Sequence, residues 1–252
     1  MDRKHKGGSA YGTKARQTPL TRGNIIAAAL ARVDRYGLEG FSIREVARDL
    51  GVYPTALYWH ARGGRNEILG AIAATAMRDV APPVEDVTDW RDWLSRLFQR
   101  YREALHRHPN VAPLLGAQLV SNAGVDPVLV ERVLAILERA GFSDVNLVNA
   151  YNAVIAAMIG FVTLELAPMP GEDPAGWADA VRQQIEGFSP QEFPILARYR
   201  NLLADRGFIL RWTSGSRVPL DGGFDVFVRA VIQGLDHLVR STGEEERAPA
   251  LV

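Results

Sequence analysis

Residues 41–60 constrain the fold of this chain more than any other stretch, because they predict two short helices joined by a tight turn. Ser42, with Glu45 three residues later, forms a capping box that predicts the start of a helix. Gly51 suits the end of that helix, since glycine adopts the left-handed backbone at little cost. Pro54 suits the first turn of a second helix, where its missing N–H is not needed. The pattern is typical of a helix-turn-helix, whose second helix can enter the major groove of DNA; an ordinary helical hairpin packed on a core is the alternative.

Several side chains of this segment suit contacts with DNA. Ser42 caps the first helix, so the backbone N–H groups at that end can point at a phosphate. Arg44 can pair with a phosphate or with a guanine edge. Tyr53 can read bases or stack on a sugar, or it is a plain surface aromatic. The second helix can present Pro54, Thr55 and Ala56 to base edges and Tyr58 and His60 to phosphates.

The N-terminal part of the chain is basic, although the formal net charge of the whole chain is zero. Residues 1–70 contain 12 Lys and Arg against 6 Asp and Glu, whereas residues 71–252 contain 17 against 23. A basic region is the electrostatic signature of phosphate binding, and DNA would repel the acidic remainder. Residues 1–18 are expected to be disordered when free; they predict either a basic arm that lies along DNA or a solubilising tail.

The remaining sequence predicts further helices and no strand, so we expect an all-α fold. Apolar periodicity and capping residues predict helices over residues 21–36, 66–80, 90–106, 111–120, 128–140, 143–166, 174–185, 190–203 and 224–239. We expect an N-terminal three-helix DNA-binding domain over residues 19–66 and a larger helical ligand-binding and dimerisation domain over residues 67–243. Residues 244–252 are expected to form a flexible tail.

The segment Leu57-Tyr58-Trp59-His60, which follows Leu50-Gly51-Val52, resembles the DNA-binding domain of the tetracycline-repressor (TetR) family. The resemblance covers about Thr21 to Met77, and beyond Met77 it is only architectural. It implies that the positions named above contact DNA. It also implies a homodimer and a ligand pocket between the helices of the second domain.

The loop before the fourth helix departs from the family pattern, which usually has a phosphate-binding lysine there. This chain reads Arg62-Gly63-Gly64-Arg65 at that place. With one extra glycine, Arg65 takes the place of the lysine, and the apolar register of Ile68, Leu69 and Ile72 favours this alignment. Without the insertion, Gly64 occupies the position and the contact is lost.

Two predicted helices, over residues 147–162 and 224–238, are more apolar than one buried stripe requires. A helix that is apolar all round must be covered on every side. Pairing each helix with its symmetry mate gives a four-helix dimer interface; the alternative is that both are central helices of a monomer. The candidate interface residues are Ala156, Gly160, Phe227, Val231, Gly234, Leu235 and Leu238.

A ligand site is expected in the second domain, where aromatic bulk and polar tips occur together. The candidate ligand-binding residues are Tyr101, Leu105, Tyr151, Ile155, Met158 and Trp177. Core packing is the alternative explanation for each of them.

Enzyme and metal-site motifs are missing from the sequence. It contains no glycine-rich dinucleotide motif, phosphate loop, zinc-protease motif or nucleophile elbow. His106 and His108 lie too far apart round a helix to chelate a metal well. We therefore expect no enzymatic activity, no cofactor and no metal.

Composition also bears on location. The chain has no cysteine, which excludes disulfides and is compatible with a reducing cytoplasm. We find no run of about 18 apolar residues, so we expect no membrane-spanning helix, and the basic N-terminus lacks the apolar segment of a secretory signal. A cytoplasmic protein without a membrane partner is predicted.

These observations together predict a ligand-responsive transcriptional regulator. We expect a homodimeric repressor that binds a palindromic double-stranded DNA operator and is released by a small, mainly apolar effector molecule. A co-repressor would act with the opposite sign. The alternative function is a helical ligand-binding or interaction protein that does not bind an operator.

Overall fold

The computed structural model describes residues 20–60, 63–85, 88–116, 126–167, 173–208 and 220–245. Within these ranges the chain is helical and contains no strand, which confirms the all-α prediction. The elements are α1 (Arg22–Tyr36), α2 (Ile43–Asp49), α3 (Pro54–His60), α4 (Gly64–Ala76), α5 (Trp90–Arg107), η1 (Pro109–Val111), α6 (Ala112–Leu115), α8 (Pro127–Ala140), α9 (Asp144–Glu165), α10 (Pro174–Glu186), α11 (Pro194–Arg206) and α12 (Asp221–Glu245). The predictions for residues 1–18, 117–120 and 246–252 lie outside the described residues.

The helix starts after Thr21, Asp89 and Asp126 were predicted correctly from these capping residues. The Thr21 hydroxyl accepts a hydrogen bond from the Asn24 N–H at 3.2 Å. The Asp89 carboxylate accepts from the Arg91 N–H at 2.9 Å, and Asp126 accepts from Val128 at 3.0 Å. These bonds satisfy N–H groups that the first turn of a helix leaves without partners.

Several boundaries differ from the prediction, and three of them have a visible structural reason or consequence. Helix α4 ends at Ala76 rather than near residue 80, because the chain turns and Asp79 takes a left-handed φ of 63°. Helix α11 begins at Pro194 rather than at residue 190, since the Ser189 hydroxyl accepts from the Glu192 N–H in a turn. Helix α12 extends to Glu245, so the predicted tail from residue 244 begins inside it.

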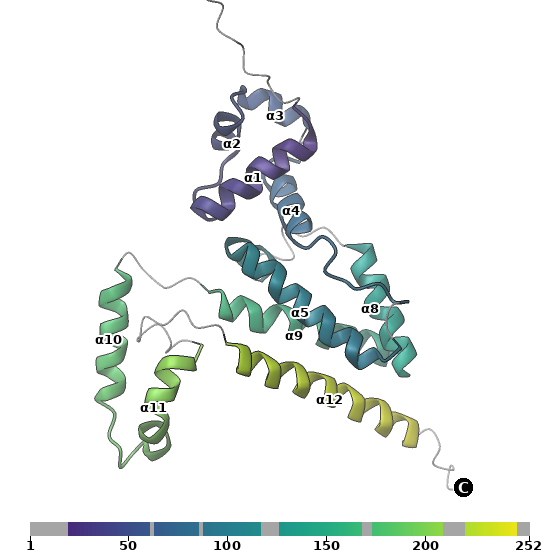
Figure 1. Cartoon of the computed structure of the whole chain (residues 1–252), viewed down its shortest axis with the longest axis vertical. Coiled ribbons are helices and arrows are strands. Elements are labelled where there is room, and N and C mark those ends of the chain that lie inside the picture. Colours follow the sequence, from purple (N-terminus) through teal and green to yellow (C-terminus); the bar gives the residue numbers. More distant parts are fainter. Residues whose placement is uncertain are drawn as a thin grey trace, which may run out of the picture.

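The helices form two packed groups and a projecting pair (Figure 1). In the first group, α1 packs against α2 and α4, and α2 packs against α3. Helix α4 leads from this group towards the second, in which α5 packs against α8, α9 and α12. Helices α10 and α11 stand apart from that group (Figure 1).

Apolar burial holds each group together. Val33, Val46, Leu57 and Ile68 are fully buried where α1 to α4 meet. Burying a side chain of this size stabilises a fold by roughly 1.5–3 kcal/mol. In the second group Trp93 is fully buried and donates its indole N–H to the Pro82 and Pro83 carbonyls at 3.2 Å each, so the segment after α4 is fixed to α5.

Helix α9 is long and apolar enough to cross a membrane, judged by length and composition alone. The sequence reasoning missed this property, because Asn149 and Asn152 interrupt the apolar run. Core helices of globular domains have the same composition, and α9 packs against α5, α8 and α12 with Val154 and Met158 buried. Its remaining apolar face is exposed, as Val148 illustrates.

A buried ionic cluster joins α5, α9 and α12. Glu165 is 4% exposed and accepts hydrogen bonds from Arg102 at 2.6 and 2.8 Å, from His106 at 3.1 Å and from the Leu220 N–H at 3.0 Å. Arg102 also pairs with Asp221 at 2.7 Å. Burial by itself raises the pKa of Glu165, but the bonds from Arg102, His106 and Leu220 outweigh it and lower the pKa to about 2. The carboxylate is therefore ionised at neutral pH.

Candidate DNA interface and ligand cavity

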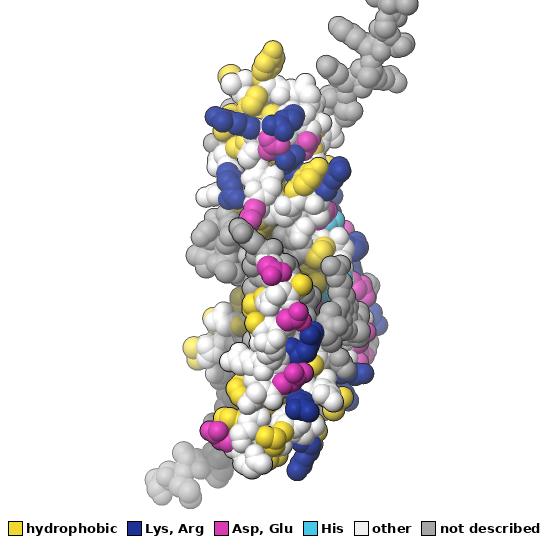
Figure 2. All heavy atoms as spheres, turned by 90° about the vertical axis from the view of Figure 1, so that its left-hand side faces the viewer, with side chains coloured by type: hydrophobic (Ala, Val, Ile, Leu, Met, Phe, Trp, Pro, Cys, Tyr) yellow, Lys and Arg dark blue, Asp and Glu magenta, His cyan; other side chains and the backbone are white. Residues whose placement is uncertain are grey.

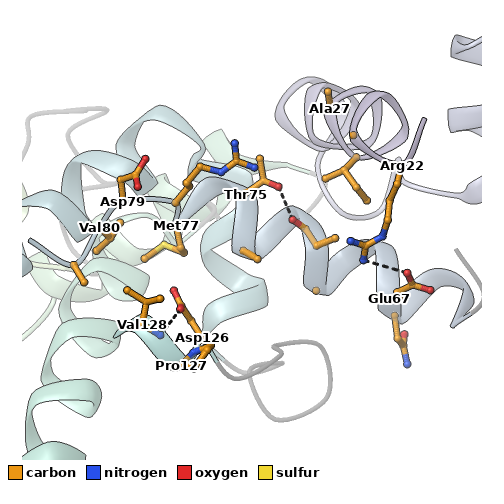
Figure 3. A pocket seen from close by; sticks show the side chains of 18 of the residues that line it. Arg22, Ala27, Glu67, Thr75, Met77, Asp79, Val80, Asp126, Pro127 and Val128 are labelled. Atoms are coloured by element: carbon orange, nitrogen blue, oxygen red, sulfur yellow. Dashed lines mark hydrogen bonds and ion pairs between the residues drawn. The ribbon is translucent and has the colours of Figure 1, made fainter. Parts of the chain in front are cut away.

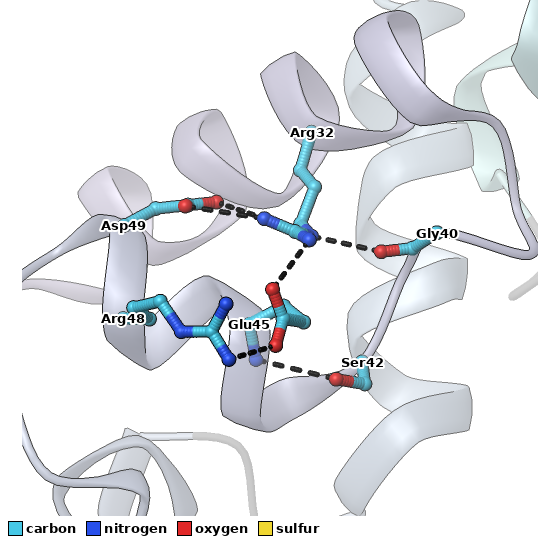
Figure 4. Close-up of polar contacts among 6 residues, drawn as sticks. All are labelled: Arg32, Gly40, Ser42, Glu45, Arg48 and Asp49. Atoms are coloured by element: carbon cyan, nitrogen blue, oxygen red, sulfur yellow. Dashed lines mark hydrogen bonds and ion pairs between the residues drawn. The ribbon is translucent and has the colours of Figure 1, made fainter.

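Only one of the two hydrogen bonds of the predicted capping box forms at the start of α2. The Ser42 hydroxyl accepts a hydrogen bond from the Glu45 N–H at 3.2 Å, as the sequence predicted. The Glu45 carboxylate does not close the predicted box; it pairs with Arg32 at 2.6 Å and with Arg48 at 2.5 Å (Figure 4). The sequence could not reveal the Arg32 partner, because α1 and α2 meet only in the folded chain.

Arg32, on α1, holds both ends of α2 (Figure 4). Its Nε donates to the Gly40 carbonyl at 2.8 Å, ahead of α2, and Nη1 donates to Asp49 at 2.9 and 3.1 Å at the end of α2. The hydrogen bond to Asp49 is the main cause that raises the pKa of Arg32, and nearby Glu45 adds to it. The guanidinium thus holds the first helix of the helix-turn-helix in one orientation.

Helix α3 leaves most of its surface open. Leu57 is fully buried, whereas Tyr58 is 52% exposed and Trp59 is 79% exposed. Gly51 takes the predicted left-handed backbone, with φ of 65°, in the turn that precedes α3. Tyr53, in the same turn, is 84% exposed. Thr55 and His60 are exposed as well, and Pro54 and Ala56 are half-buried.

Trp59 was not among the predicted site residues, although its position between Tyr58 and His60 carried the signal. Its large apolar surface is exposed on the same short helix. Figure 2 shows exposed hydrophobic and basic side chains together at the end of the molecule where α1 to α3 lie. This mixture of aromatic and basic groups suits bases and phosphates.

Two arginines flank the helix pair. Arg44 on α2 is exposed and forms no ion pair within the described ranges. Arg65 is exposed in the first turn of α4, with its guanidinium 5.6 Å from the centre of the Phe41 ring. Gly64 begins α4 with a left-handed φ of 66°, and Arg62 lies outside the described residues.

A cavity of about 250 Å³ lies in the second group of helices. Four of the predicted ligand residues line it: Tyr101, Tyr151, Ile155 and Met158. The predictions for Leu105 and Trp177 are wrong for this cavity. Leu105 is fully buried in the core, and Trp177 belongs to α10, which stands apart (Figure 1).

Helix α4 forms one wall of this cavity. The wall consists of Gly70, Ala73, Ala74 and Met77, which sequence reasoning missed because the predicted ligand-binding residues all lie between residues 101 and 177. The other walls come from α5, α6, α8 and α9. A molecule in the cavity therefore touches the helix that continues into the helix-turn-helix group.

An open groove of about 1370 Å³ runs between α1, α4 and the start of α8 (Figure 3). Arg22 and Glu67 form an ion pair across it at 3.2 Å. The groove shares Gly70, Ala74 and Met77 with the cavity. The two hollows therefore meet along one face of α4.

A second connection joins the two groups of helices. The Asn110 side-chain amide, in η1, donates to the Val33 and Asp34 carbonyls near the end of α1 at 3.0 Å each. His108 pairs through Nδ1 with the Asp34 carboxylate at 2.9 and 3.1 Å. The sensor helices thus hold α1 directly, in addition to the covalent link through α4. We call these four residues the α1 clamp.

The predicted interface residues divide by burial. Ala156, Gly234 and Leu238 are exposed, and Gly160, Phe227 and Val231 are half-buried. The prediction for Leu235 is wrong, because this side chain is 3% exposed and faces the core of its own chain. Phe227 also has partners within the chain, since it stacks on Phe161 with ring centres 5.2 Å apart.

Comparison with known proteins defines the class. Residues 82–207 match the tetracyclin repressor-like C-terminal domain. The chain is 30% identical over 194 residues to an HTH-type transcriptional regulator of Saccharopolyspora erythraea, covering 75% of this chain and 77% of that protein. The chain therefore belongs to the TetR family of DNA-binding transcriptional regulators.

The chain is also similar to individual repressors and solved structures. The class A tetracycline repressor protein of Escherichia coli is 32% identical over 170 residues, covering 63% of this chain and 72% of that protein. Mycobacterium smegmatis BioQ has a TM-score of 0.62 at 25% identity, covering 87% of this chain and 99% of BioQ. BioQ solved with its double-stranded DNA operator has a TM-score of 0.53 at 29% identity, covering 67% of this chain and 98% of that one.

Proposed function

We propose that this chain is a homodimeric repressor that releases a palindromic DNA operator when a small, mainly apolar molecule enters the cavity. One observation carries the proposal. Helix α4 packs against α1 beside the helix-turn-helix and forms a wall of the cavity farther along. A ligand that favours one position of α4 therefore favours one position of the DNA-binding helices.

The DNA-binding surface consists of the exposed side of α3 and the start of α2. We assign base contacts to the N-terminal end of α3 and to Arg44, and phosphate contacts to the polar side chains that follow. Arg65 takes the role of a phosphate-binding residue in this assignment, because its side chain is exposed beside the helix pair. The residues assigned are Ser42, Arg44, Tyr53, Pro54, Thr55, Ala56, Tyr58, His60 and Arg65, with Trp59 added.

The outward faces of α9 and α12 form the dimer interface in this proposal. Both helices expose apolar side chains there, including Val148, Leu164, Val226 and Leu238. Exposed apolar surface on two neighbouring helices is costly in water and is typical of interaction sites. A two-fold dimer would present two copies of α3 to two half-sites of an operator.

Two further assignments complete the proposal. We place the boundary between the DNA-binding and sensor domains near residue 66, inside α4. We also place the protein in the cytoplasm, because a chain without cysteine has no disulfide that would need an oxidising compartment.

The test is selection of bound duplexes from a random library, followed by fluorescence anisotropy at fixed salt. We expect a palindromic consensus and weaker binding by Arg44→Ala and Tyr58→Phe. Arg198→Ala is the matched control, because it removes the same charge from an exposed position on α11. Unchanged affinity in both DNA-side variants, or no selected sequence, would refute the proposal.

A further inference from the structure

Tyr101 carries a buried hydroxyl in the wall of the cavity. The side chain is 1% exposed, and its hydroxyl has no hydrogen-bond partner in the part of the chain that the structure describes. Buried tyrosine hydroxyls normally have a partner, because an unpaired buried polar group costs free energy. A hydroxyl at a cavity wall without a described partner indicates that a ligand there should supply a hydrogen-bond acceptor.

Burial raises the pKa of Tyr101 above its ordinary value of 10.0. The phenol therefore keeps its proton at neutral pH and can donate a hydrogen bond. Tyr151, which also lines the cavity, has its pKa raised by burial as well. Neither phenol offers a positive charge.

The rest of the described lining is apolar except at one edge. It includes Leu115, Leu129, Ile155 and Met158, and it contains no Lys, Arg or His. The one carboxylate in the described lining is Asp126, which is exposed and caps α8. An anion in this cavity would meet no positive charge from the described lining residues, and burying an unpaired charge is costly.

We propose that the cavity selects a neutral, mainly apolar molecule with a hydrogen-bond-accepting oxygen, and that the Tyr101 hydroxyl donates to this oxygen. The inference rests on the proposed function, because it names the ligand class of the same regulatory cavity. Tyr101 determines specificity in this account: the apolar walls bind the body of the molecule, and the phenol selects for the acceptor.

Three probes with one bicyclic body test the inference: 2-acetylnaphthalene, 2-isopropylnaphthalene and 2-naphthoate. Calorimetric titration of the full chain should rank the ketone first, the hydrocarbon second and the carboxylate last. Tyr101→Phe should weaken ketone binding by roughly 2- to 10-fold, the usual range for one hydrogen bond, and should leave hydrocarbon binding equal or tighter. Tyr199→Phe, on exposed α11, is the matched control and should change neither value.

Thermal unfolding of Tyr101→Phe tests the inference without any ligand. Tyr101→Phe keeps the ring and removes a hydroxyl that has no partner among the described residues, so its melting temperature should equal or exceed that of the wild type. A lower melting temperature would show that the hydroxyl already has a partner and would refute the inference.

Other results would overturn the ligand class. They are equal losses for ketone and hydrocarbon in Tyr101→Phe, no loss for the ketone, tightest binding of the carboxylate, or no binding of any probe. Operator binding by the ligand-free wild type, measured beside the probe titrations, separates the two proposals. If the wild type bound no operator while the probes behaved as expected, the proposed function would fail and the ligand class would stand.

Discussion

Replacement of Glu165 by glutamine tests the buried cluster that joins α5, α9 and α12. The carboxylate accepts hydrogen bonds from Arg102, His106 and the Leu220 N–H, which lower its pKa from 4.5 to about 2. Each pKa unit corresponds to about 1.4 kcal/mol, so the ionised form stabilises the fold by about 3 kcal/mol at neutral pH. Glu165→Gln keeps the shape of the side chain and removes this charge.

The sign of the pH dependence follows from the lowered pKa. A carboxyl group with a lower pKa in the folded state stabilises the fold above its unfolded pKa, here about 4.5, and this stabilisation is lost as pH falls towards 2. The deficit of Glu165→Gln should therefore shrink from about 3 kcal/mol at neutral pH to about 2 kcal/mol at about pH 3.5, and further below that. Glu165→Gln changes neither partner of the Arg102–Asp221 pair.

Urea unfolding at fixed protein concentration, followed by circular dichroism from neutral pH to about pH 3, measures this deficit. Glu131→Gln, an exposed change on α8, is the control and should cost little at every pH. A deficit of Glu165→Gln that is the same at neutral and acidic pH would refute the reasoning, because it would arise from shape rather than from ionisation.

Three further changes test the dimer, the α1 clamp and the cap. Leu238→Glu should give monomers in light scattering and keep a normal helix content in circular dichroism. Leu235→Ala should cost about 2–5 kcal/mol in urea unfolding, because Leu235 is buried in its own chain. Monomers from Leu235→Ala and an intact dimer from Leu238→Glu would contradict the proposed interface. Asn110→Ala should weaken operator affinity several-fold, because it frees the end of α1. Unchanged affinity in fluorescence anisotropy would show that the α1 clamp does not contribute to DNA binding. Ser42→Ala should cost about 1 kcal/mol of stability, and equal urea midpoints for the two proteins would contradict the role of the cap.

Local signals predicted much of the fold. Capping residues such as Thr21, Asp89 and Asp126 mark helix starts, because the capping bond forms within one turn of chain. The same kind of signal failed at Ser189, which is followed by a proline. The proline at residue 190 suited a first helical turn, but the chain forms a turn there and begins α11 at Pro194.

Contacts between distant residues could not be predicted. Periodicity shows that α12 has an apolar face but not which neighbour covers it, and so Leu235 was assigned to an interface although it is buried in its own chain. The pairing of Arg32 with Glu45 and of Asn110 with α1 depends on how helices meet. The Tyr101 hydroxyl, which has no hydrogen-bond partner among the described residues, is likewise a result of packing.

The most direct test of the account is operator affinity measured with and without saturating 2-acetylnaphthalene. The account predicts that the ketone, bound against the α4 wall, lowers operator affinity by about 5- to 150-fold, the usual range for coupled sites. By reciprocity, saturating operator must lower ketone affinity by the same factor. A ketone that occupies the cavity in calorimetry and leaves operator affinity unchanged would contradict the claim that α4 couples the two sites.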